Sequence, residues 1–237
     1  LEGEIIVLNS LFAGNTTQFG SNLSPADGGA VKVAGGISPG STTKVEIINC
    51  TFADNAAVGS SNGDDARGGA LFIASPGIGQ SAVPIEIHNS ILWENEDFLG
   101  DGCESQIAGD AGAALVTYTD VSGIDLVLCP WATGANMNVE FDPLYTLPPS
   151  DYRLLPTSSL IDIGDSSRVP ADELNVDDDN DLAEPAPDLD LQIRTSGAAC
   201  IVDLGAYELL VTCLHDLTLD GIVGFQDLKS CGNQQKS

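Results

Sequence analysis

The most constraining feature of the sequence is a motif that recurs every 40 residues. The segments IIVLNSLFAGN, VEIINCTFADN and IEIHNSILWEN align without gaps and occupy residues 5–15, 45–55 and 85–95. In each copy, alternating apolar residues are followed by Asn, then by Phe or Leu, then by a second Asn. Alternation with a period of two predicts a β-strand with one buried face. The chain is therefore expected to repeat one short strand unit at a fixed interval.

A second apolar element recurs between the copies of the first. It reads GGAVKVAGG at 28–36, GGALFIAS at 68–75 and, in a weaker form, AGAALVTY at 111–118. The segments between the elements are rich in Gly, Ser, Pro, Asn and Asp, which favours surface loops. One strand pair cannot bury its own apolar face, whereas stacked copies can. The sequence therefore predicts an all-β, parallel β-solenoid in which equivalent residues lie on one another.

The repeated polar and aromatic positions are predicted to form a structural ladder. An Asn at a turn satisfies backbone groups and can donate to the Asn of the next copy. The alternative interpretation, in which the Asn columns bind a ligand, remains open. The positions concerned are Asn9, Asn49, Asn89, Asn15, Asn55, Asn95, Phe12, Phe52 and Leu92.

The GGA and FxxN signatures resemble those of right-handed parallel β-helix repeats of the polymorphic outer-membrane protein type. The resemblance covers residues 1–119 and implies a right-handed parallel β-helix of about four coils. That type includes adhesins and surface-displayed passengers, and the broader class includes pectate lyases and polygalacturonases. FDPLY (141–145), DYRLLPTSSLIDIGD (151–165) and VDLGAYE (202–208) resemble the C-terminal coils of secreted bacterial β-helix proteins. In those proteins this part closes the solenoid.

The charge and the cysteines restrict the partners and the compartment. With 35 acidic and 8 basic residues the net charge is −27, which excludes nucleic acid and anionic membrane surfaces as natural partners. Calcium is the expected counter-ion. Six cysteines favour disulfides in an oxidising, extracellular or cell-surface setting, although fifteen pairings are open. We expect a monomer without a transmembrane segment, and we expect that residue 1 is not the natural start.

A predicted calcium loop lies near the end of the sequence, in DLTLDGIVGFQDL at 216–228. Its spacing matches the twelve-residue calcium loop, and its terminal Asp resembles the dockerin version. A dockerin carries two such loops, so this one is truncated. Cys213 and Cys231 flank it and are candidates to clamp it. The predicted ligands are Asp216, Thr218, Asp220, Ile222 and Asp227.

Other candidate sites are weaker. The acidic segment 172–190 has carboxylates with alternating spacing, but we expect a solvated, partly mobile loop. His88 is expected at the surface. Trp93 is a candidate platform for a sugar ring if its side chain faces outward. Neither a paired-carboxylate hydrolase motif nor a lyase motif is recognisable, so no catalytic residue is assigned.

Three parts of the chain follow from this reasoning: repeat coils at 1–119, C-terminal coils and a closing segment at 120–211, and a small calcium-loop and helix appendage at 212–237. The expected function is a secreted or cell-surface scaffold that acts in adhesion or glycan contact, without catalysis and stabilised by calcium. Two alternatives remain: a fragment of a polysaccharide-degrading lyase or glycoside hydrolase, and a dockerin-type assembly module.

Overall fold

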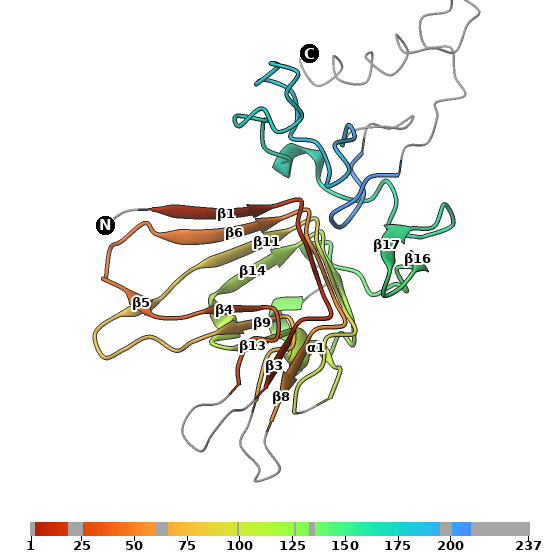
Figure 1. Ribbon diagram of the computed structural model, residues 1–237. Helices are drawn as coiled ribbons and strands as arrows, with labels where there is room; N and C mark the ends of the chain where they lie inside the picture. The colour runs from red at the N-terminus through yellow and green to blue at the C-terminus, as the bar shows by residue number, and fades with distance from the viewer. Residues whose placement is uncertain are drawn as a thin grey trace, which may run out of the picture.

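The computed structural model describes residues 3–18, 26–59, 66–98, 100–125, 127–132, 136–194 and 201–209. Their regular secondary structure is almost entirely β, and the three larger sheets are parallel and lie against one another (Figure 1). Sheet 1 contains, in spatial order, β1 (Glu4–Leu8), β6 (Lys44–Ile48), β11 (Ile85–His88) and β14 (Ala114–Thr117). Sheet 2 contains β2 (Leu11–Ala13), β7 (Thr51–Ala53), β12 (Ile91–Trp93) and β15 (Asp120–Val121).

Further strands complete each repeat. Sheet 3 contains β4 (Val31–Val33), β9 (Leu71–Ile73) and β13 (Ile107–Gly109). Small pairs are formed by β3 (Thr16–Gln18) with β8 (Ala56–Val58), and by β5 (Gly36–Ile37) with β10 (Ser81–Ala82). The remaining elements are α1 (Cys103–Gln106), η1 (Ala111–Ala113), η2 (Pro130–Ala132), β16 (Tyr145–Leu147), β17 (Asp151–Leu154) and η4 (Ser166–Arg168).

The pairing register follows the sequence repeat. Ile5 pairs with Val45 and Val45 with Ile85, so the first three copies lie side by side in register. This arrangement is compatible with a β-helix. The fourth copy is shorter, because Ile85 pairs with Ala114. The assignment of 111–118 to the second element was therefore wrong: β14 continues sheet 1, and β13 is the third strand of sheet 3. The change in spacing hides this from a search at a 40-residue period.

The main core lies between the sheets and consists of equivalent residues from successive repeats. Ile47, Ile87 and Val116 are almost fully buried, whereas Glu46 and Glu86 on the same strands point away from the core. The rings of Phe12 and Phe52 stack with centroids 4.6 Å apart and planes 8° from parallel. Parallel, in-register strands place like residues next to one another, which explains why apolar positions recur at equal spacing.

Both glycines of the GGA motif are required by the backbone. Gly28 and Gly68 have φ values of +76° and +73°, a region that other residues rarely adopt. Gly69 has a different constraint, because a Cβ there would lie 2.4 Å from the carbonyl oxygen of Glu96 in the next repeat. The first glycine therefore makes the turn, and the second allows two repeats to approach closely.

The chain after the repeats, described at 136–194 and 201–209, is called the C-terminal segment, and it covers the outer face of sheet 2. Ile91 of β12 packs in a second core with Leu154, Leu160 and Leu204. The backbone N–H of Ala206 donates to the Thr51 hydroxyl at 3.0 Å. In Figure 1 this segment, coloured from green to blue, lies beside the edge where sheets 1 and 2 meet. The C-terminal segment, which lacks the 40-residue motif, thus packs across several repeats.

Candidate functional site

The second Asn column forms a continuous chain of hydrogen bonds. Asn15 Nδ2 donates to Asn55 Oδ1 at 2.9 Å, and Asn55 Nδ2 donates to Asn95 Oδ1 at 2.8 Å. Asn95 Nδ2 then donates to Gln106 Oε1 of α1 at 2.6 Å. Asn55 and Asn95 are fully buried. The column therefore connects the repeats to α1, a connection that the sequence motif did not suggest.

The first Asn column behaves differently. Asn9, Asn49 and Asn89 have φ values of 49°, 51° and 50°, the left-handed region that Asn tolerates. Their side chains do not bond to one another. Asn9 Nδ2 donates to the carbonyl of Pro187, and Asn89 Oδ1 accepts from the N–H of Asp165 at 2.7 Å. All three residues are turn positions, and Asn9 and Asn89 also hold the C-terminal segment.

Leu92 and Trp93 lie on opposite faces of β12. Leu92 is buried in the main core, in register with Phe52. Trp93 is half-buried and packs against the second core, which the C-terminal segment completes. The sequence did not predict that Trp93 is partly covered, because the residues that cover it do not belong to the repeated motif. Glycan contact through Trp93 would have to use the part of its ring that remains exposed.

The expectation that His88 lies at the surface was wrong. Its side chain is 1% exposed. Nδ1 lies 2.6 Å from the Thr117 hydroxyl, and Nε2 lies 3.4 Å from Glu86 Oε2. Burial, reinforced by the positive charge of Arg168, lowers the pKa of His88. His88 is therefore a neutral packing residue at neutral pH.

A pocket of about 540 Å³ lies beside β13, the edge strand of sheet 3. Its wall includes Trp131 of η2 and Glu104 of α1, both partly exposed, and the exposed Arg67. Ile107 and Leu128 add apolar surface. The pocket thus combines an indole, a guanidinium group and a carboxylate around an apolar floor, a common composition for a small-molecule site.

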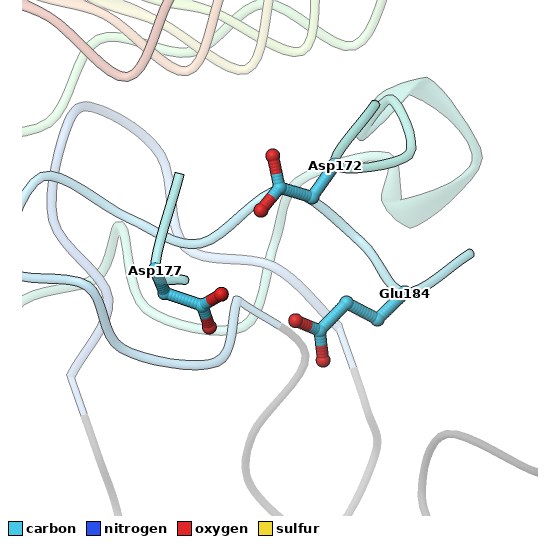
Figure 2. Close-up of side chains that lie close together, drawn as sticks. All are labelled: Asp172, Asp177 and Glu184. Carbon is cyan, nitrogen blue, oxygen red and sulfur yellow. The ribbon is translucent and has the colours of Figure 1, made fainter. Parts of the chain in front are cut away.

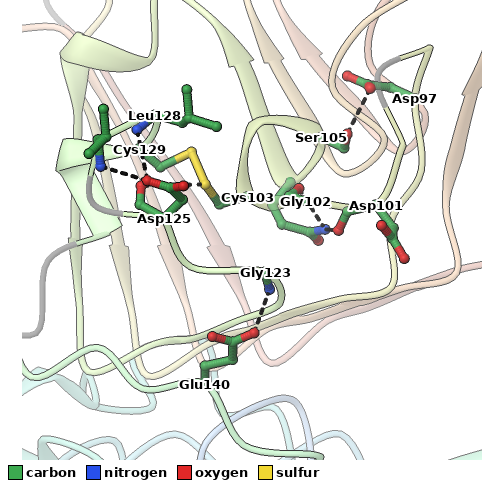
Figure 3. Close-up of a disulfide and its surroundings, with 12 residues drawn as sticks. Asp97, Asp101, Gly102, Cys103, Ser105, Gly123, Asp125, Leu128, Cys129 and Glu140 are labelled. Carbon is green, nitrogen blue, oxygen red and sulfur yellow. Dashed lines mark hydrogen bonds between the residues drawn. A yellow bond between two sulfur atoms is a disulfide. The ribbon is translucent and has the colours of Figure 1, made fainter.

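A disulfide holds two walls of this pocket together (Figure 3). It joins Cys103, the first residue of α1, to Cys129 beside η2. The carboxylate of Asp125 accepts the N–H groups of Val127 and Leu128 at 2.8 and 3.3 Å, which shapes the loop before Cys129. The positions of Glu104 and Trp131 are therefore fixed by a covalent link as well as by packing.

The other described cysteine, Cys50, is free and fully buried, and burial raises its pKa. The even cysteine count therefore does not mean that every cysteine is paired. Cys200, Cys213 and Cys231 lie outside the described residues.

Part of the acidic segment 172–190 is more ordered than a solvated loop. Asp172 and Asp188 are each 2% exposed. Asp172, Asp177 and Glu184 direct carboxylate oxygens toward one another, and these atoms lie within 4.8 Å (Figure 2). Burial and the neighbouring acidic groups raise the pKa of Glu184 to about 7. Such oxygens suit calcium, although acidic groups also cluster without an ion.

Arg194 is a fully buried cation beneath the C-terminal segment. Its Nε donates to Asn9 Oδ1 at 3.0 Å, and Nη1 lies 3.9 Å from Glu208 Oε2. Burial raises the pKa of Glu208, and Asp188 and Asp203 add negative charge around the guanidinium group. Arg194 therefore ties residues near the end of the described chain to the first repeat.

The predicted calcium loop cannot be placed. Asp216, Thr218, Asp220, Ile222 and Asp227 lie outside the described residues, as does all of 212–237. Among the residues that are described, no helix has the length and apolar character needed to cross a bilayer.

Comparisons of the chain with protein-family models, with curated proteins and with solved structures found no match.

Proposed function

We propose that the chain is a right-handed parallel β-helix scaffold, of the polymorphic outer-membrane protein type, from a secreted or bacterial cell-surface protein. In this proposal it contacts glycans and catalyses no reaction. The repeat motif and the parallel, in-register sheets support the architecture. The pocket formed by Arg67, Glu104 and Trp131 is the observation that carries the proposed function.

The chemistry of this pocket suits a sugar. An indole stacks on the apolar face of a pyranose ring, while guanidinium and carboxylate groups bond to hydroxyl groups at its edge. Trp131 and Glu104 stand on elements joined by a disulfide, so little ordering is needed when a ligand binds. The apolar wall contributed by Leu128, which is 55% exposed, would be covered by the ligand.

The experiment is a binding panel of acidic and neutral polysaccharides, read by calorimetry. Arg67→Gln and Trp131→Leu should each weaken binding by about tenfold, a loss of about 1.4 kcal/mol. Arg168→Gln removes an exposed positive charge elsewhere and serves as the control, and Trp93→Leu tests the other tryptophan. Equal binding by all four variants would contradict the assignment to this pocket. New reducing ends or unsaturated products would instead support the enzyme alternative.

Calcium stabilisation is the second part of the proposal. The carboxylates of Asp172, Asp177 and Glu184 support it by their chemistry and proximity. If calcium binds the folded chain only, 100-fold excess over Kd stabilises it by about 2.7 kcal/mol. Asp177→Asn should reduce this gain, whereas Asp178→Asn, which changes an exposed neighbour outside the triad, should not.

The dockerin-like loop is tested separately with Asp216→Ala. If the loop is the main calcium site, this variant loses most of the calcium response and Asp177→Asn loses little. If neither variant changes the response, calcium does not act through either group of acids.

A further inference from the structure

Within the described part of the chain, one face of the first repeat is uncovered. In the second and third repeats the equivalent face is covered by the repeat before it. Ile5, Val45 and Ile85 occupy equivalent core positions, yet their exposed fractions are 59%, 8% and 0%. Val7 on the same strand is only partly buried, whereas its equivalent Ile47 is 1% exposed. We call the edges and apolar residues of β1, β2, β3 and β4 the N-terminal face. Its composition is that of an inter-repeat surface, although no described residue packs across it in that way.

The backbone of the N-terminal face is also unpaired on one side. β1, β2, β3 and β4 each lie at the edge of their sheet. The N–H of Asn9 donates to Ile48, and the carbonyl of Gly3 accepts from Lys44. Hydrogen-bonding direction alternates along a strand, so the N–H groups of Ile6 and Leu8 point away from β6. Unpaired edges of this kind are templates for a further strand.

The Asn column has an open end at the same face. Asn95 Oδ1 accepts the backbone N–H and the side-chain amide of Asn55, and Asn55 Oδ1 accepts the same two groups of Asn15. Among the described residues, Asn15 Oδ1 accepts no such pair, and Asn15 is exposed. The vacant acceptor suits one more Asn at the same position of an added repeat.

We propose that the N-terminal face is a docking surface for one further β-repeat of the same class. The added repeat would run parallel to β1 and in register with it, and it would carry alternating apolar residues followed by Asn-x-x-Phe-x-x-Asn. Continuity with the interface between the first and second repeats carries the argument, because the same apolar, backbone and Asn groups recur there. A second complete copy of the chain is a poorer occupant, since each copy carries a net charge of −27.

The test adds such a repeat by fusion and measures the protection of backbone N–H groups at the open edge of β1. A copy of residues 41–80 is placed directly before Leu1, which preserves the 40-residue spacing. Hydrogen exchange by NMR then follows the amides of Ile6 and Leu8. The matched control is the same fusion with Ile47→Asp and Asn55→Ala in the added copy only.

Docking predicts that exchange at Ile6 and Leu8 slows by at least about tenfold in the fusion, and that the control fusion restores fast exchange. Unchanged exchange in the first fusion, or equal protection in both fusions, would overturn the proposal. Concentration-dependent protection in the original chain would overturn it in favour of a second copy as the occupant.

Discussion

Asn55→Ala tests how much the second Asn column contributes to the free energy of unfolding. The Asn55 side chain is fully buried and takes part in four hydrogen bonds. Its Oδ1 accepts from the backbone N–H and from Nδ2 of Asn15, at 3.0 and 2.9 Å. Its Nδ2 donates to the carbonyl of Phe12 and to Asn95 Oδ1, both at 2.8 Å. An alanine side chain can form none of these hydrogen bonds.

The expected loss follows from these contacts. A net contribution of about 1 kcal/mol per bond gives a destabilisation of about 4 kcal/mol. Asn15→Ala is the matched control, because it makes the same substitution in the same column at an exposed position. Its side chain makes one of these bonds, so it should cost about 1 kcal/mol or less.

Urea unfolding followed by circular dichroism measures both variants. With a slope of about 3 kcal/mol per molar urea, Asn55→Ala should lower the midpoint by about 1.3 M and Asn15→Ala by about 0.3 M. Equal midpoints for the two variants would refute the reasoning, because the loss of stability would then not depend on burial or on the number of hydrogen bonds removed.

Three further predictions concern other parts of the structure. Gly69→Ala should destabilise the chain by about 1–3 kcal/mol in the same urea assay, because its Cβ would meet the backbone of Glu96, whereas Gly102→Ala, with nothing within 4 Å, should cost less than about 1 kcal/mol. Replacing Cys103 and Cys129 by Ser should cost about 3.5 kcal/mol, from the entropy of closing a loop of 26 residues, and an unchanged midpoint would show that the link contributes nothing. In the presence of a chelator, the raised pKa of Glu184 makes the folded state relatively more stable below the unfolded pKa of about 4.5. This stabilisation is lost as the pH rises through about 7. Glu184→Gln should therefore flatten the decline of the melting temperature between pH 5 and pH 7, and an unchanged slope would contradict the assignment.

The repeated part of the fold could be predicted because its signal is periodic. Asn15, Asn55 and Asn95 stand at one spacing, so parallel stacking in register follows from the alignment alone. The fourth repeat could not be placed in the same way, because the pairing offset shortens where Ile85 meets Ala114.

The C-terminal cover depends on contacts between residues far apart in the chain. Arg194 bonds to Asn9, and Asp165 bonds to Asn89, pairs with no shared pattern. The burial of His88 and the partial cover of Trp93 follow from tertiary packing and could not be found from alternation. Sequence reasoning also missed the pocket beside β13. Arg67 and Trp131 are distant in sequence and carry no shared pattern, and they line one pocket only in the folded chain.

Hydrogen-bond scalar couplings test the central structural claim, in-register parallel stacking of the repeats, most directly. A long-range NMR correlation experiment links a donor nitrogen to the acceptor carbonyl carbon. Parallel stacking predicts correlations from Asn9 to Ile48, from Val45 to Pro84 and from Asn49 to His88. Carbonyl partners displaced by even one residue, or correlations typical of antiparallel hairpins within one repeat, would contradict the stacking on which the account depends.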